Sequence, residues 1–391
     1  MEDCANMAIR SALQGLRVFC KFLSANDAGQ TGGHQKGIYV SRPSAPILFD
    51  QPGIKGQNKE KRVKIRWMDG NETNSRFICY GQGTRNEYRI TNFGRGFPYL
   101  RPNCAGALFV LVQDSSENYQ AFVLDAEDEI NWFLDAFAMS PTETGRLIDV
   151  RNAAPATLEQ NEFERFLGRV GVGFPTSDAM SEAARKICNA VYMHAESVFS
   201  NPDRALLEWM NLEYKLFRAL ERVRYGDRIS QGFDSVEEFI ETATQIINRR
   251  KSRAGKSLEH HLSAIFKSHR LIFEEQAVTE GNKRPDFLFP SQEAYRLGSY
   301  PTDRLITLAA KTTCKDRWRQ VINEADRLRG RPKYLCTLQQ GISAAQMDEM
   351  ESELVILVVP QPYISSFPKD RQNRIWSLSR FVDYVKKIEG L

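Results

Sequence analysis

Alternating hydrophobic and polar positions dominate the first 170 or so residues of the chain. Residues 61–68 alternate large apolar side chains with Arg and Lys, the period of a strand that buries one face and exposes cations on the other. Residues 107–113 and 120–124 are apolar segments between polar turn residues, and residues 28–33 form a glycine-rich loop. This pattern predicts a β-rich barrel or sandwich.

The period of the pattern changes after a stretch rich in glycine and proline at residues 168–177. From residue 206 to residue 220, apolar residues recur every three or four positions behind an Asn-Pro-Asp start, which predicts an amphipathic helix. Two further helices are predicted at residues 235–248 and 257–269. Four strands are predicted at residues 286–289, 305–311, 333–338 and 354–359. One further helix is predicted at residues 317–328.

Strands that alternate with helices are typical of an α/β domain around a mixed sheet. The chain has 391 residues, which is too many for one ordinary core. We therefore predict an α+β protein of two domains, residues 1–171 and 181–391, joined by a linker at residues 172–180.

Cysteine usage and apolar runs exclude several classes of protein. The seven cysteines are odd in number and include no Cys-x-x-Cys pair, which argues against a disulfide framework and a zinc knuckle. The N-terminus lacks the apolar run of a signal peptide, and the longest apolar stretches have only the length of a strand. We expect a cytoplasmic protein without a membrane span.

The formal net charge of +4 conceals an asymmetry along the chain. Residues 117–165 hold eleven acidic and three basic residues, a net of −8, whereas residues 246–335 hold nineteen basic and ten acidic residues, a net of +9. A basic region of this size indicates a nucleic-acid partner, although a solvated face has the same composition. Whether the basic region binds nucleic acid or is only a solvated face depends on whether a reactive site lies beside that region.

Three residues of the second domain can form a phosphodiester-cleaving site. Asp286 precedes a predicted strand, Lys311 ends the next one, and Glu324 lies on the helix that is predicted to follow. Two carboxylates can hold a divalent metal ion against a phosphodiester, and a lysine can orient the attacking water and offset the charge on phosphorus. Magnesium suits such an all-oxygen ligand set.

This arrangement resembles the PD-(D/E)xK nuclease signature, with one departure. Ala309 stands where the signature has an acid two residues before the lysine, and some restriction enzymes of that superfamily supply the missing carboxylate from the following helix. Glu324 lies at the edge of the apolar stripe of the predicted helix and therefore faces the sheet. The alternative is that Pro285 and Asp286 are an ordinary turn and Lys311 an exposed strand end.

Longer stretches favour the nuclease. The catalytic domain of EcoRII-type restriction endonucleases is similar to residues 248–259, 279–290 and 311–326. The amino-terminal effector domain of the same family is similar to residues 23–35 and 84–96. The resemblance implies an N-terminal β-rich DNA-binding pseudobarrel and a C-terminal α/β restriction-endonuclease-like domain with a mixed sheet.

By matching position, the resemblance implies that Asp286, Lys311 and Glu324 are the catalytic set, with Asp286 and Glu324 as Mg²⁺ ligands. Glu259 is implied as a further catalytic acid near the metal, and its alternative is a helix salt bridge. Tyr295 stands where the family has a tyrosine near the active site. Its alternative is a surface aromatic residue.

DNA contacts in the catalytic domain are expected on both sides of the catalytic residues. Lys315, Asp316 and Arg317 follow Lys311 closely enough to reach the major groove, where Lys or Arg can donate to guanine and Asp can accept from cytosine. The alternative is an ion cluster at a helix N-terminus. Phosphate contacts are expected at Arg249, Arg250, Lys251 and Arg253.

In the family, two arms of the N-terminal domain grip a second copy of the target. Here the first arm is residues 24–39 and the second is residues 85–95, and their candidate contacts are Asn26, Asp27, His34, Tyr39, Arg85, Glu87, Arg89 and Arg95. A cross-strand charge ladder on the second arm and a buried structural histidine at position 34 are the alternatives. Gly83 and Tyr88 stand where a well-known member has lysines, which puts the affinity of the second arm in doubt.

The resemblance implies a type II restriction endonuclease that is homodimeric through its C-terminal domain. It implies Mg²⁺-dependent hydrolysis of double-stranded DNA at a site of the CC(A/T)GG kind, 5′-phosphate ends, and a host cytosine methyltransferase for self-protection. It further implies that the N-terminal domain blocks the catalytic cleft until it binds another site. Docking of the acidic stretch on the basic region would provide such autoinhibition. The rival hypotheses are a structure-specific repair nuclease and a DNA-binding regulator with a decayed nuclease centre.

Overall fold

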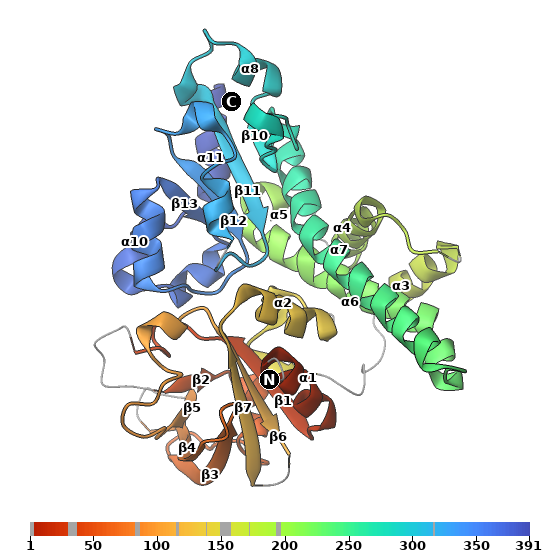
Figure 1. The fold of residues 1–391 in the computed structure, drawn as a ribbon, viewed down its shortest axis with the longest axis vertical. Helices are drawn as coiled ribbons and strands as arrows, with labels where there is room; N and C mark the ends of the chain where they lie inside the picture. Colours follow the sequence, from red (N-terminus) through yellow and green to blue (C-terminus); the bar gives the residue numbers. More distant parts are fainter. Residues whose placement is uncertain are drawn as a thin grey trace.

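The computed structural model describes two bodies, one above the other in Figure 1. The lower one holds the first sheet, and the upper one holds the second sheet and the long helices. The described residues are 4–29, 37–82, 87–114, 117–137, 139–148, 158–171, 173–192, 197–315 and 317–391.

The first sheet has eight strands in the order β2-β5-β4-β3-β7-β6-β1-β8, and every pairing except β3 with β7 is antiparallel. The sheet curves into a near-barrel, which confirms the predicted β-rich first domain. Its strands are β1 Arg17–Phe22, β2 Ile38–Val40, β3 Lys59–Trp67, β4 Glu72–Tyr80, β5 Glu87–Thr91, β6 Leu108–Gln113, β7 Asn118–Leu124 and β8 Arg146–Ile148.

Both faces of this sheet are buried, as β6 illustrates. Phe109 and Leu111 face the inside of the barrel, while Leu108, Val110 and Val112 contribute to a second core. That second core is closed by helices α1 (Cys4–Gln14) and α2 (Glu127–Ala136), which cover the outer face. Because α2 lies between the barrel and the upper body, it also contacts α7 (Val236–Ser268) of the upper body.

The second sheet has five strands in the order β13-β12-β11-β10-β9. β11, β12 and β13 are parallel, whereas β10 is antiparallel to both β9 and β11, so the predicted mixed sheet is confirmed. Helices lie on both of its faces and bury two apolar cores. The strands are β9 Glu274–Glu275, β10 Phe287–Phe289, β11 Ile306–Lys311, β12 Lys333–Thr337 and β13 Val355–Val358.

The helices of the second body correct two predictions from the sequence. The two helices predicted at residues 235–248 and 257–269 are one 33-residue helix, α7, because the polar stretch between them consists largely of good helix formers that show no apolar period. The other helices are α3 Leu158–Arg169, α4 Ser177–Tyr192, α5 Ser197–Ser200, α6 Pro202–Gln231, α7 Val236–Ser268, α8 Gln292–Arg296, α9 Trp318–Val321, α10 Ala344–Ser352 and α11 Leu378–Glu389.

The helix predicted at residues 317–328 is also wrong. It consists of the single turn α9 and the 3-10 turn η6 (Asp326–Leu328), with Glu324 in a bend between them. The side chains of Thr279 and Glu280 form hydrogen bonds with backbone groups that a continuous helix would use for its own hydrogen bonds. Thr279 Oγ1 donates to the carbonyl of Glu324 at 2.6 Å, and Glu280 accepts from the amides of Asp326 and Arg327 at 3.1 Å each.

The predicted domain boundary at residue 171 stays a prediction. Helix α3, which precedes that residue, packs with helices that follow it: Phe163 lies in their core, and Lys215 of α6 donates to Glu159 at 3.1 Å. All seven cysteines are free thiols. Among the described residues, no helix is long and apolar enough to cross a membrane.

Candidate active site

The pairing of β10 with β11 brings Asp286 and Lys311 together. Asp286 directly precedes β10, and Phe287 pairs with Leu308, so the aspartate lies beside the end of β11. Its Oδ2 accepts hydrogen bonds from the backbone amide of Ala310 at 2.7 Å and from Lys311 Nζ at 3.0 Å. Burial lowers the pKa of Lys311, but Asp286 and the other nearby carboxylates outweigh burial and hold that pKa above its usual value.

Glu324 joins this pair from the bend after α9. Burial, reinforced by the charge of Asp286 and opposed by Lys311, raises the pKa of Glu324 to about 7. Its Oε2 is buried and accepts no hydrogen bond from the described residues. An added cation would stabilise the charged form of this half-buried acid, because its buried oxygen has no hydrogen-bond partner among the described residues and a second carboxylate lies beside it.

Glu259 reaches the cluster from α7 through a residue that sequence reasoning missed. Gln276 Nε2 donates to Glu259 Oε2 at 3.2 Å and to Asp286 Oδ1 at 2.9 Å. Lys256 also donates to Glu259, at 2.8 Å, so the alternative of a helix salt bridge describes one of its contacts. Gln276 lies outside the PD…K pattern and in no periodic segment, and nothing in the sequence marked it.

The donor chemistry of the cluster fits a magnesium ion. No three His, Cys, Asp or Glu side chains in the described part of the chain lie close enough together to form a ready-made metal site. Asp286 and Glu324 nevertheless supply the carboxylate oxygens that Mg²⁺ prefers, and Mg²⁺ needs only one or two of them because it retains water. The unpaired buried oxygen of Glu324 is the group that a cation would satisfy.

Tyr295 supports the active-site segment through Glu280. Its hydroxyl donates to both carboxylate oxygens of Glu280, at 2.8 and 2.7 Å, and the residue is 3% exposed. The alternative of a surface aromatic residue is therefore wrong. A catalytic role for Tyr295 stays a prediction.

The segment that follows β11 is covered by the start of α2. Thr313 Oγ1 donates to Glu127 at 3.1 Å, and the backbone amide of Arg317 donates to the other oxygen of Glu127 at 3.0 Å. Arg317 Nη2 also pairs with Asp128 at 2.9 Å, and Lys315 is paired with Asp125. These contacts join the two candidate DNA-reading residues Lys315 and Arg317 to the N-terminal domain. The third candidate, Asp316, lies outside the described residues.

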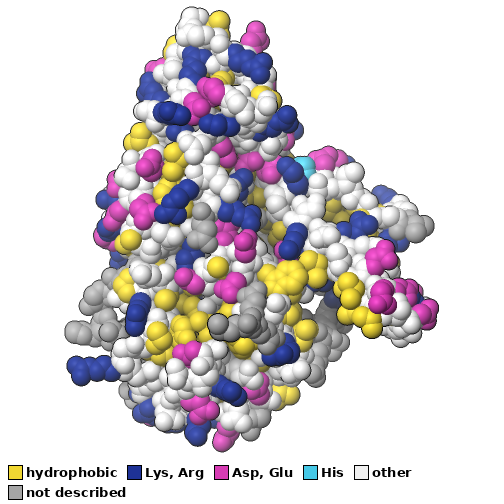
Figure 2. Space-filling view, viewed as in Figure 1, with side chains coloured by type: hydrophobic (Ala, Val, Ile, Leu, Met, Phe, Trp, Pro, Cys, Tyr) yellow, Lys and Arg dark blue, Asp and Glu magenta, His cyan; other side chains and the backbone are white. Residues whose placement is uncertain are grey.

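The four basic residues of α7 that are predicted to contact phosphate lie against acidic and aromatic side chains and a backbone carbonyl group of the protein itself. Arg250 donates to Glu221 Oε1 at 2.8 Å and to the carbonyl of Asp135, also at 2.8 Å. Arg249 stacks on Phe174, Lys251 lies over Trp132, and Arg253 is buried on Tyr214, with Glu213 3.7 Å away. A role of these four residues in phosphate contact stays a prediction. Figure 2 shows basic and acidic side chains intermixed over the upper body.

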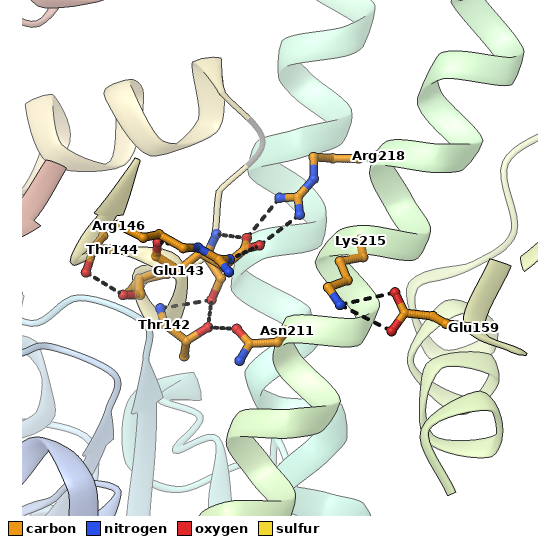
Figure 3. A network of polar contacts seen from close by, with 10 residues as sticks. Thr142, Glu143, Thr144, Arg146, Glu159, Asn211, Lys215 and Arg218 are labelled. Carbon is orange, nitrogen blue, oxygen red and sulfur yellow. Dashed lines mark hydrogen bonds and ion pairs between the residues drawn. The ribbon is translucent and has the colours of Figure 1, made fainter. Parts of the chain in front are cut away.

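A second polar contact between the two domains lies at the 3-10 turn η3 (Pro141–Glu143). Arg218 of α6 donates two hydrogen bonds to Glu143, at 2.8 and 2.9 Å, and Thr142 is hydrogen-bonded to Asn211 (Figure 3). Burial raises the pKa of Glu143, but Arg218 outweighs it and holds that pKa below its usual value. No pattern in the sequence indicates these contacts, which lie between residues about seventy positions apart.

The candidate DNA contacts of the first arm differ in how far their side chains are exposed to solvent. Asp27 is buried and accepts from Lys21 at 2.6 Å and from the amide of Tyr39 at 2.9 Å, so its carboxylate ties the loop together. Burial raises the pKa of Asp27, but Lys21 and the hydrogen bonds outweigh it and hold that pKa below its usual value. Asn26 and Tyr39 are exposed, and His34 lies outside the described residues.

The second arm is only partly described. Arg89 is 6% exposed, pairs with Glu87 at 3.2 Å and donates to the carbonyl of Gly37, whereas Arg95 is exposed. Tyr88 points into the barrel core, where its hydroxyl accepts from the amide of Gly53 at 2.8 Å. Gly83 and Arg85 lie outside the described residues. A cavity of about 760 Å³ lies between the arms and is lined by Asp27, Gly29, Asn92, Phe93, Gly94, Gly96, Phe97, Leu100, Arg101 and Pro102.

Both domains match known protein families. A model described as "EcoRII C terminal" matches residues 217–382, and one described as "Restriction endonuclease EcoRII, N-terminal" matches residues 12–139. The type II restriction enzyme EcoRII of Escherichia coli is 34% identical over an alignment of 406 positions, which covers 96% of this chain and 96% of that enzyme.

Two solved structures resemble the chain weakly. Metal-depleted Ecl18kI in complex with uncleaved, modified DNA is 19% identical with a TM-score of 0.47, over 59% of this chain and 84% of that one. The complex of restriction endonuclease PspGI with substrate DNA is 16% identical with a TM-score of 0.44, over 61% and 99%. These structures are too distant to inform the site. The family matches in both domains, together with 34% identity over nearly the whole length, show that the chain belongs to the EcoRII family of type II restriction enzymes, which are site-specific deoxyribonucleases.

Proposed function

We propose that this enzyme hydrolyses double-stranded DNA at a short G·C-flanked site of the CC(A/T)GG kind, with Mg²⁺, and leaves 5′-phosphate ends. The observation that carries the proposal is the cluster of Asp286, Lys311 and Glu324, in which Lys311 bonds one acid and the other has an unpaired buried oxygen. This arrangement supports a centre that is completed by a cation and a phosphodiester.

Each residue of the cluster has a role that its contacts support. Asp286 and Glu324 would hold the metal, and Glu259 would lie beside them as a further acid. The bound Mg²⁺ would act as a Lewis acid on the phosphoryl oxygen and lower the pKa of a bound water. Lys311, which stays protonated because of Asp286, orients the attacking water and offsets the charge that develops on phosphorus.

The proposal includes control by the N-terminal domain. In the observed arrangement, Lys315 is 5% exposed and paired with Asp125, while Arg317 is held by Glu127 and Asp128. If these cations read G·C pairs, α2 must leave them before DNA can enter. Binding of a second DNA site between the arms of the N-terminal domain is the event that we propose for this release.

The remaining parts of the proposal come from the family. The enzyme acts as a homodimer through its C-terminal domain in the bacterial cytoplasm, and a cognate cytosine methyltransferase protects the host DNA. The exposed apolar residues of the helical hairpin formed by α6 and α7, among them Val223, Ile229 and Phe239, are available for contact with a second copy.

One assay tests the target, the cut position and the control together. Unmethylated plasmid DNA is digested in Mg²⁺ with and without a short CC(A/T)GG duplex, and the ends are sequenced. We expect defined fragments with 5′-phosphate ends and faster cleavage when the duplex is present. Fragments without a common sequence would instead favour a repair nuclease, and binding without cleavage in any metal would favour a regulator with a decayed centre.

A further inference from the structure

Gln276 occupies an unusual place beside the catalytic cluster. It follows β9 with a φ of +53°, a left-handed conformation that is uncommon for residues other than glycine. Its backbone amide donates to the carbonyl of Asp286 at 3.1 Å. Main chain and side chain of Gln276 are thus both tied to the same aspartate.

The side chain of Gln276 joins two carboxylates that come from different layers of the domain. Its Nε2 donates to Asp286 Oδ1, at the sheet, and to Glu259 Oε2, on α7. Both partners are acceptors, so the amide nitrogen must face them, with one hydrogen for each. Asp286 Oδ2 is held independently by Ala310 and Lys311, and Gln276 therefore fixes the remaining rotation of this carboxylate.

The geometry points to Gln276 as a positioning residue, a neutral donor that holds Asp286 and Glu259 in the orientation that receives the metal ion. This inference rests on the proposed function, because it takes Asp286 as a metal ligand. A neutral amide suits the task for an electrostatic reason. Two neighbouring carboxylates repel each other, and a lysine or arginine between them would occupy the place of the metal charge, whereas an amide orients them and leaves their negative charge intact.

Metal binding by the full-length protein without DNA tests the inference. We expect Gln276→Met, which keeps the length of the side chain and removes the donor, to bind Mn²⁺ about 10- to 100-fold more weakly in isothermal titration calorimetry. The Mg²⁺ concentration for half-maximal cleavage should rise in parallel. Gln245→Met is the matched control, because Gln245 also donates to a glutamate but lies on an exposed part of α7.

A second variant separates metal binding from folding. Gln276→Lys keeps a donor and adds a positive charge, so we expect a melting temperature near that of the wild type together with weaker Mn²⁺ binding. Wild-type Mn²⁺ affinity in Gln276→Lys would overturn the idea of a neutral donor. A lower melting temperature in Gln276→Met with unchanged Mn²⁺ affinity would show that the residue is merely structural, and would also overturn the inference.

Asp286→Asn distinguishes failure of this inference from failure of the proposed function. If Asp286→Asn retains both Mn²⁺ binding and cleavage, the metal site that the proposed function places at Asp286 is wrong. If Asp286→Asn loses both while Gln276→Met loses neither, the catalytic assignment stands and only the role of Gln276 is wrong.

Discussion

Two acidic clusters of this protein differ in how their charge is balanced. In the catalytic cluster (Glu259, Asp286, Glu324 and Lys311), Lys311 contacts Asp286 and Lys256 contacts Glu259, whereas the buried oxygen of Glu324 has no hydrogen-bond partner among the described residues. Burial leaves Glu324 with a pKa of about 7. The interdomain cluster (Asp125, Glu127 and Asp128 of the N-terminal domain, with Lys315 and Arg317) pairs every acid with a cation, an amide or a hydroxyl group.

This difference indicates which kind of partner each cluster is suited to bind. The catalytic cluster leaves the buried oxygen of Glu324 without a partner among the described residues and is suited to take a cation from solution. The acids of the interdomain cluster are already paired within the chain, and its cations are the residues that we expect to meet DNA. Asp125 and the first acids of α2 thus occupy these cations in the way that a nucleic acid would, and we expect DNA to compete with them.

The largest effect should come from the catalytic cluster. Asp286→Ala or Lys311→Ala removes a group whose charge has no substitute in the cluster, and we expect cleavage of cognate DNA to fall about a thousandfold or more. Initial rates on a short cognate duplex in Mg²⁺ measure this. Asp303→Ala, at an exposed position of the same domain, is the control and should cut normally. Intact cleavage by either catalytic variant would rule out the assignment.

The interdomain cluster should respond in the opposite direction. Glu127→Gln weakens the hydrogen bonds from Thr313 and Arg317, which involve a charged acceptor and contribute about 1.5–3 kcal/mol each. We expect cleavage of DNA with a single site, without added duplex, to rise about 10- to 100-fold. Glu72→Gln, on the exposed end of β4, should leave this rate unchanged. A fall in the rate would mean that docking does not repress the enzyme.

Docking should also depend on pH through Asp135 of α2. Burial raises the pKa of Asp135 from 3.8 to about 6, although Arg253, Lys251 and Arg250 of α7 lower it. Because the docked state binds the proton more tightly, docking should weaken about tenfold as the pH rises from 5 to 7. Small-angle scattering at increasing salt concentration can follow domain separation. We expect less salt to be needed at pH 7 than at pH 5 in the wild type.

In Asp135→Asn this pH dependence should disappear, because the amide does not titrate. A wild-type salt profile that is the same at both pH values would show that Asp135 does not control docking. The variant must retain the wild-type melting temperature for the comparison to hold.

The smallest effect is expected at the rim of the interdomain cluster. Arg317 and Asp128 form an ion pair at 2.9 Å, but their side chains are 47% and 89% exposed. Exposed pairs contribute little, so Asp128→Asn should change single-site cleavage by less than about threefold. A change as large as that of Glu127→Gln would mean that charge at the rim, rather than the buried hydrogen bonds, holds the domains together.

Local sequence was sufficient for the strands and for the proximity of Asp286 and Lys311, whose catalytic role stays a prediction. The strands near Val63 and Leu308 follow from apolar period and length, and Asp286 and Lys311 follow from a motif with fixed chemistry. The helix around Glu324 was predicted wrongly, because Thr279 and Glu280 compete for its backbone groups. The local pattern around Glu324 carries no information about the side chain of Thr279, which lies forty-five positions away in the sequence.

The sequence by itself determined that the chain has two domains of different class, and it predicted that the acids and the lysine of a phosphodiester-cleaving site lie in the second. Only the tertiary structure decided that Gln276 joins Asp286 to Glu259 and that Asp125 pairs with Lys315 across 190 positions of sequence. The physical reason is that hydrophobic period and motif spacing report on single elements. Hydrogen bonds and ion pairs between elements depend on how those elements pack, which is determined by the whole chain.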